Sequence, residues 1–341
     1  MTTGNPALLR DAQQRVQQFH AAGRPRTIGK PPGKPKPEDL RKLQFSPHGW
    51  PVTRDALVSQ LRRLLAESEQ PNQQGTSYCG PAAFLYCLLE DCPDVYVDYA
   101  IHLWSYGSYD FGAVDVDADA VTTRSLRTIN QQRNAAPKGR HISSLDWMTM
   151  ASLSASTRPF FTGGGGAELD DVGTSITYPW VLKAWFASVG ARAVYDCMGL
   201  GALKTGLRPF VELMRHWQRC WLVLQIDSSL ITGGEPNTVR KRHWVVVDPH
   251  QMPRVRRGDG KLVPLGSIGD QFARPADPRV PVDVLDSRLH GWKMDLKVVT
   301  WGKEGYPLTL SLLGDVPQPL LRRLRLSPPA LKEHRTCATS R

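Results

Sequence analysis

Helical patterns fill the first half of this chain and strand patterns the second, and this order constrains the fold most. Segments typical of helices lie at 6–20, 54–66, 79–89, 94–105, 143–151, 179–189 and 207–219. Short β-rich runs follow at 221–226, 243–247 and 294–301. Because helices come first and strands later, we expect an α+β fold with a mostly antiparallel sheet in the C-terminal half.

The composition divides the chain into one large domain with two extensions. Residues 1–50 are expected to be a basic extension, because the stretch 23–40 is rich in Pro, Gly and Lys. Residues 51–315 hold enough apolar residues for a single domain, interrupted by a long Pro-, Arg- and Asp-rich insert at 248–290. Residues 316–341 are expected to be a basic, disordered tail.

The net charge of +11 is concentrated in a few segments. Residues 1–70 carry +6, while 240–261 and 316–341 carry +5 each, so the rest of the chain sums to −5. Such arms can contact nucleic acid, a membrane surface or an acidic protein, although solvated arms are the plainer interpretation. The chain has no apolar run of the roughly 18 residues that a membrane span needs, and no signal-peptide pattern at its start. We therefore expect synthesis in the cytoplasm and no membrane span, with delivery by another route left open.

The cysteine and acidic patterns indicate no metal and no cofactor. Six cysteines are expected to be free thiols: Cys79, Cys87, Cys92, Cys197, Cys220 and Cys337. None forms a Cys/His cluster with zinc spacing. The alternating Asp115, Asp117 and Asp119 lack the glutamate that would complete a calcium loop, so we interpret them as a solvated turn.

Cys79 stands at the predicted start of a helix, after a polar segment that contains glycine. The N-terminus of a helix presents unpaired N–H groups and a partial positive charge, which lower the pKa of a thiol and can hold an oxyanion. A lone cysteine in a helix is more often structural. The neighbouring Gly, Pro and Gln residues favour a nucleophile here.

His243 is the base expected beside this thiol. Among the nine histidines it alone opens a strongly apolar strand. A core strand delivers a side chain rigidly, which suits a general base. A strand histidine is by itself more often structural, but a thiol followed by such a histidine is the pair that acyl transfer needs.

Three ordered segments carry a resemblance to a known family. They are Gln73-x5-Cys79-Gly-Pro-Ala, His243-Trp-Val-Val-Val, and Val299-Thr-Trp-Gly followed by Gly305-Tyr. Together they resemble papain-like cysteine peptidases. The first two are closest to the double-glycine peptidases that process bacteriocins and to papain-fold toxins of bacterial secretion systems. The third is similar to the segment that follows the papain asparagine.

The resemblance implies a papain-like fold, with Cys79 at a helix N-terminus in a helical half and His243 in a C-terminal sheet. Residues 51–315 would then be the catalytic domain. Gln73 would supply the side-chain donor of the oxyanion hole, with Gln74 as its rival one residue later.

The third catalytic residue departs from the family pattern, because Val299 stands where papain has its asparagine. Thr300 would lie beside His243 if 294–301 pairs antiparallel with 243–247. Asp248 lies five residues past His243, about 16 Å along an extended strand, so the chain would have to fold back. Thr300, Asp248 and a simple Cys–His pair stay open.

From these residues we expect a thiol-dependent amide hydrolase, a cysteine protease acting on a protein or peptide. The resemblance to secretion-system toxins implies a delivered effector with an immunity protein as partner, and with secretion-apparatus or chaperone contacts through the basic extensions. The same site also serves deamidases, transglutaminases, acyltransferases and peptidoglycan amidases. A basic nucleic-acid-binding protein with an inert papain-like core is the alternative from another class.

Overall fold

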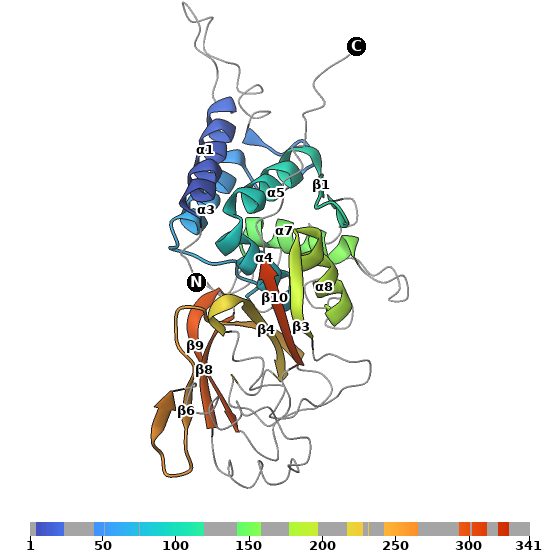
Figure 1. The fold of residues 1–341 in the computed structure, drawn as a ribbon. Coiled ribbons are helices and arrows are strands. Elements are labelled where there is room, and N and C mark those ends of the chain that lie inside the picture. The colour runs from blue at the N-terminus through green and yellow to red at the C-terminus, as the bar shows by residue number, and fades with distance from the viewer. Residues whose placement is uncertain are drawn as a thin grey trace, which may run out of the picture.

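The computed structural model describes residues 5–23, 44–50, 52–74, 76–118, 142–157, 177–196, 217–227, 231, 242–264, 293–300, 302–311 and 320–326. Helices gather at one end of this part of the chain and the strands of an antiparallel sheet at the other (Figure 1). The fold is therefore α+β, as the order of the sequence patterns predicts.

The helices begin and end close to the residues that the sequence predicts. They are α1 (Pro6–Ala22), α3 (Arg54–Leu65), α4 (Cys79–Asp91), α5 (Pro93–Tyr106), α7 (Ser144–Ser156) and α8 (Pro179–Ser188). Local capping fixes several of these ends, since Thr53 accepts a hydrogen bond from Ala56 and proline opens α5 and α8. Of the helix expected at 207–219, only a 3-10 turn at Trp217–Arg219 lies within the described ranges.

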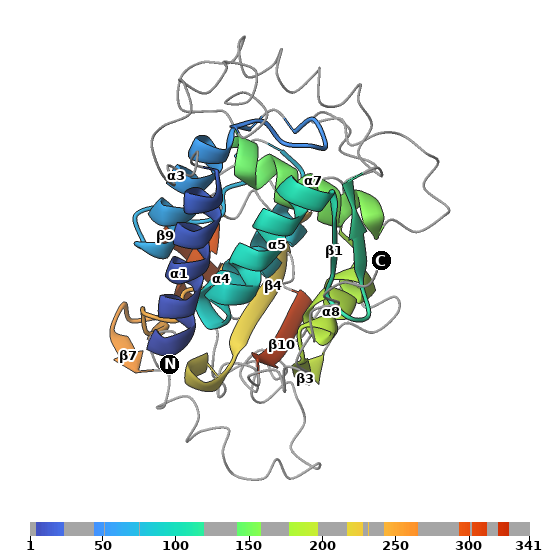
Figure 2. The same ribbon diagram turned by 90° about the horizontal axis from the view of Figure 1, so that it is seen from above.

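Helix α4 lies at the centre of the helical half. It contacts α5, α7 and α8 as well as the sheet, and residues on all its sides are buried. A helix that is apolar all round belongs in a core. Seen from the helical end, α4 and α5 cross the middle of the molecule between α1 and α8 (Figure 2). This packing holds the first residue of α4, Cys79, in a fixed position.

The large sheet is antiparallel at every pairing and runs in the order β3-β10-β4-β5-β8-β6-β7, with β9 on the other side of β8. Its strands are β3 (Ala191–Asp196), β4 (Trp221–Asp227), β5 (Arg242–Val247), β6 (Arg254–Arg256), β7 (Leu262–Pro264), β8 (Lys293–Thr300), β9 (Lys303–Ser311) and β10 (Leu320–Leu326). A separate hairpin joins β1 (Ser108–Asp110) to β2 (Asp115–Asp117). Strand β5, which carries His243, lies in the interior of the sheet between β4 and β8.

Three segments differ from the expected boundaries. Helix α1, assigned above to an extension, packs against α3 and α5 and buries Ala12 and Val16 in the core. Strand β10 lies within the expected tail and pairs with β3 and β4. Strands β6 and β7 form a hairpin inside the expected insert. In each case a distant partner orders a segment whose local sequence is polar or basic.

The helices within the described ranges include none that is both long and apolar enough to cross a membrane.

Candidate active site

Cys79 opens α4, and its buried sulfur faces backbone N–H groups. These belong to Trp244, to Gly80 and to Cys79 itself, and each lowers the pKa of the thiol. The Trp244 N–H belongs to the peptide bond that follows His243. The thiol therefore lies against the beginning of β5, and the fold brings the predicted nucleophile next to the backbone of the predicted base.

The segment before α8 closes over the start of α4. A Cβ atom at Gly80 would lie only 2.2 Å from Thr177 Oγ1, so glycine is required there. Trp244 Nε1 donates to the Thr177 carbonyl at 2.9 Å and fixes this segment from the sheet side. Sequence reasoning missed Thr177, and the glycine directly after Cys79 was the one signal of a close approach.

His243 forms a hydrogen bond with Thr300. The distance from His243 Nε2 to Thr300 Oγ1 is 2.5 Å. The strand register explains the contact, because Val246 opposite Val299 places Thr300 opposite Val245, two residues from His243 and on the same face. Val299 points to the other face and joins the core with α4. The prediction that Thr300 lies beside His243 is confirmed.

Asp248 lies elsewhere and does not orient the imidazole. Its N–H donates to the Lys297 carbonyl, which continues the pairing with β8 for one more residue. Its carboxylate accepts hydrogen bonds from the His250 N–H at 2.8 Å and from Gln251 Nε2 at 3.0 Å. The structure therefore does not bring Asp248 beside His243, since the strand does not fold back and the carboxylate caps the turn after β5.

Gln73 is buried in the loop that leads into Cys79. The Gln73 side-chain Nε2 donates to the Thr76 backbone carbonyl at 2.9 Å, and the Gln73 backbone carbonyl accepts from the Thr76 hydroxyl at 2.7 Å. Gln74 has a left-handed φ of +51°, which reverses the chain at this point. The Gln73 carboxamide thus braces its own loop, with one of its two N–H groups engaged there.

Burial shifts both titrating groups of the site toward their neutral forms. It raises the pKa of the Cys79 thiol, and the three backbone N–H groups offset this effect only in part. It lowers the pKa of His243 to about 4. The expectation of a lowered thiol pKa is therefore reversed, because a helix N-terminus stabilises a thiolate less than removal from water destabilises it.

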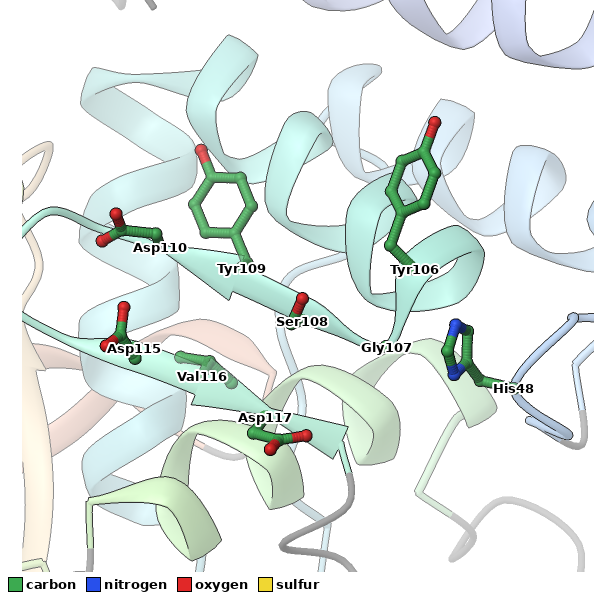
Figure 3. Close-up of a pocket in the computed structure, with 9 residues that line it drawn as sticks. All are labelled: His48, Tyr106, Gly107, Ser108, Tyr109, Asp110, Asp115, Val116 and Asp117. Carbon is green, nitrogen blue, oxygen red and sulfur yellow. The ribbon is translucent and has the colours of Figure 1, made fainter. Parts of the chain in front are cut away.

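A pocket of about 480 Å³ lies away from these residues. It is formed where the end of α5 meets the β1–β2 hairpin, and its acidic side chains come from the hairpin (Figure 3). Asp115 and Asp117 are exposed on its rim. None of the predicted site residues lines it. Within the described ranges no group of three or more His, Cys, Asp or Glu side chains is arranged to hold a metal ion.

No protein-family model, no curated protein and no solved structure matches this chain. The geometry of the fold and of the site therefore defines the class of protein. It is an α+β protein in which a buried thiol at a helix start meets a strand whose histidine is bonded to a threonine.

Proposed function

We propose that this protein is a papain-like cysteine hydrolase that cleaves an amide bond in a protein or peptide. The observation that carries the proposal is the His243–Thr300 hydrogen bond at a strand whose next peptide N–H faces the Cys79 sulfur. A nucleophile, a base and a group that orients the base are the three parts that thiol-dependent acyl transfer requires.

Each residue has a role in this proposal. Cys79 attacks the carbonyl carbon of the scissile amide. Because Thr300 engages Nε2 of His243, the thiol proton passes to Nδ1, and the same nitrogen later returns it to the leaving amine. The backbone N–H of Cys79 and the side chain of Gln73 hold the negative charge on the carbonyl oxygen.

The pKa shifts favour proton transfer during attack over a standing thiolate–imidazolium pair. A thiol pKa raised by burial and an imidazole pKa of about 4 leave both groups neutral at pH 7. Neutral imidazole is the form that accepts a proton. The base is therefore ready above about pH 4, and the thiol is activated as the substrate carbonyl approaches.

The cellular role follows from the resemblance of the Cys79 and His243 segments to secretion-system toxins. On that basis we propose a delivered effector that is held in check by an immunity protein. Deamidation, transglutamination and acyl transfer use the same acyl-enzyme and differ in the group that resolves it, so they stay alternatives to hydrolysis.

Acylation of Cys79 by p-nitrophenyl acetate tests the proposal. We expect nitrophenol release with an acetyl group on the Cys79 peptide in mass spectrometry, and loss of both in Cys79→Ala and His243→Asn. Cys220→Ala is the matched control, since Cys220 is also a buried free thiol. Release that persists in Cys79→Ala would overturn the proposal. Adding glycinamide to the acylated protein distinguishes hydrolysis from transfer to an amine.

A further inference from the structure

The turn between β8 and β9 packs directly on the loop that carries Gln73. Gly302 has a φ of +69°, and a Cβ atom at this position would lie 2.4 Å from Asn72 Cβ and 2.6 Å from Asn72 Nδ2. Gly302 follows Thr300 by two residues. The Asn72 side chain therefore rests against the backbone that leads out of the His243–Thr300 contact.

Asn72 also fixes the conformation of its own loop. Its Oδ1 accepts a hydrogen bond from the Gln74 N–H at 2.8 Å, which closes a turn around Gln73. Gln74 holds the left-handed φ of +51° within this turn. The Asn72 side chain therefore bridges Gln73 through its hydrogen bond to Gln74, and it also contacts the turn that follows Thr300.

A second contact, made by the start of β9 just after this turn, joins the sheet to the helical half. Glu304 Oε1 accepts hydrogen bonds from Gln70 Nε2 at 3.0 Å and from the Tyr86 hydroxyl at 3.1 Å. Gln70 belongs to the Gln73 loop, and Tyr86 lies on α4, the helix that Cys79 opens. The turn after Thr300 and the start of β9 therefore contact both the loop that carries Gln73 and α4, the helix that Cys79 opens.

We propose that Asn72 is a positioning residue that sets the oxyanion donor Gln73 relative to Thr300, and this inference rests on the proposed function. A site of this kind must hold its groups within about 0.5 Å of productive geometry. Truncating Asn72 to alanine removes the hydrogen bond that closes the turn around Gln73 and the carboxamide part of the packing on Gly302. The oxyanion donor then loses its fixed position, while Cys79 and His243 stay in place.

Two reactions of the same thiol separate positioning from a general structural role. Acylation by p-nitrophenyl acetate develops an oxyanion, whereas alkylation by iodoacetamide does not. We expect Asn72→Ala to lower the acylation rate about tenfold or more and to leave the alkylation rate within about twofold of wild type. Asn72→Asp keeps the acceptor atom for Gln74 and should recover most of the acylation rate.

Two glycine variants test the contact between Gly302 and Asn72 independently, one of them as a matched control. Gly302→Ala should lower acylation because its methyl group meets Asn72. Gly260→Ala, at a φ of +82° with open space around it, carries the same backbone strain and should keep the wild-type acylation rate. These variants decide the question if Asn72→Ala does not fold.

The outcomes separate the two proposals. Wild-type acylation with an unchanged rate in folded Asn72→Ala, or in Gly302→Ala, overturns the role of Asn72 and leaves the proposed function standing. A parallel loss of alkylation in Asn72→Ala also overturns it, because the defect is then general. Absence of Cys79 acylation in the wild-type protein overturns the proposed function, and this inference with it.

Discussion

Cys79 is subject to two opposing effects, and its burial decides the balance. The start of α4 supplies N–H groups that favour a thiolate, but the packed core excludes the water that would solvate it. Burial also favours the neutral form of His243, because it lowers the pKa of the imidazole to about 4. The sulfur of Cys79 therefore stays protonated at neutral pH.

Alkylation of Cys79 by iodoacetamide should therefore rise only at alkaline pH. A pKa raised above the ordinary thiol value of 9.0 keeps the thiolate fraction below one half until the pH exceeds that value. The measurement is the alkylation rate from pH 6 to 10, read for each cysteine by mass spectrometry. Cys87, whose pKa is raised further by burial and by nearby carboxylates, is the internal control and should react more slowly. A plateau below pH 8 would contradict the prediction.

Removal of the Thr300 hydroxyl should slow acylation without unfolding the protein. Thr300→Val keeps the shape of the side chain and loses the hydrogen bond to His243, which contributes about 1 kcal/mol, so the rate should fall roughly five- to tenfold. Thr300→Ser keeps the hydroxyl and should stay close to wild type. Equal rates in the two variants would show that this contact does not orient the imidazole.

The distance between the side chains of Cys79 and His243 is a further prediction. We expect a crystal structure to place Cys79 Sγ within about 5 Å of a ring nitrogen of His243, as a thiol and its base require. A separation above about 8 Å would leave the thiol without its base.

Helix α1 shows how an element gains its place from packing. The basic stretch that follows it favours an extension, yet Ala12 and Val16 are fully buried and Arg15 forms an ion pair with Asp98 on α5. The apolar positions of α1 therefore belong to the same core as α4. Removal of residues 1–50, which the composition would allow, should cost stability.

A single substitution on α1 measures this contribution. Val16→Ala should lower the free energy of unfolding by about 2 kcal/mol, because two buried methyl groups are lost and a cavity remains. Gln17→Ala, one residue along on the exposed face, is the matched control and should leave the free energy of unfolding unchanged. Urea unfolding of both variants gives the comparison. Equal urea midpoints for Val16→Ala and Gln17→Ala would mean that α1 contributes nothing to the stability of the core.

The two halves of the molecule meet at a cluster of carboxylates. Burial and, after it, the charges of Glu304, Glu67 and Asp91 together raise the pKa of Glu90 on α4 to about 7. Glu304 lies at the start of β9, so this repulsion acts across the contact between helices and sheet. The folded protein holds a proton that the unfolded chain releases, and stability from this group is lost as the pH rises from about 4.5 to about 7.

Neutralising Glu90 should flatten this pH dependence. Glu90→Gln should raise stability by roughly 1–3 kcal/mol at pH 8 and change it little at pH 4.5, where Glu90 is protonated in the folded protein. Thermal unfolding at both pH values measures the difference. Asp115→Asn on the exposed β1–β2 hairpin is the control. A stabilisation of equal size at both pH values would show that packing, and not the charge, is responsible.

The sequence by itself determined the helix positions and the α+β order, and it singled out Cys79 and the start of the strand at His243, which the fold brings together. These follow from local signals, such as the cap at Thr53 and the proline at the start of α8, and from the apolar run after His243. Such signals act over a few residues, so they can be identified without knowledge of the partner.

Only the tertiary structure decided which of Thr300 and Asp248 lies beside His243, because the answer depends on the register of β5 against β8. It also decided that strand β10 joins the sheet and that burial outweighs the helix terminus at Cys79. Each outcome comes from contacts between segments far apart in the chain. The free energy of such contacts depends on packing, pairing and exclusion of water, and no local pattern contains it.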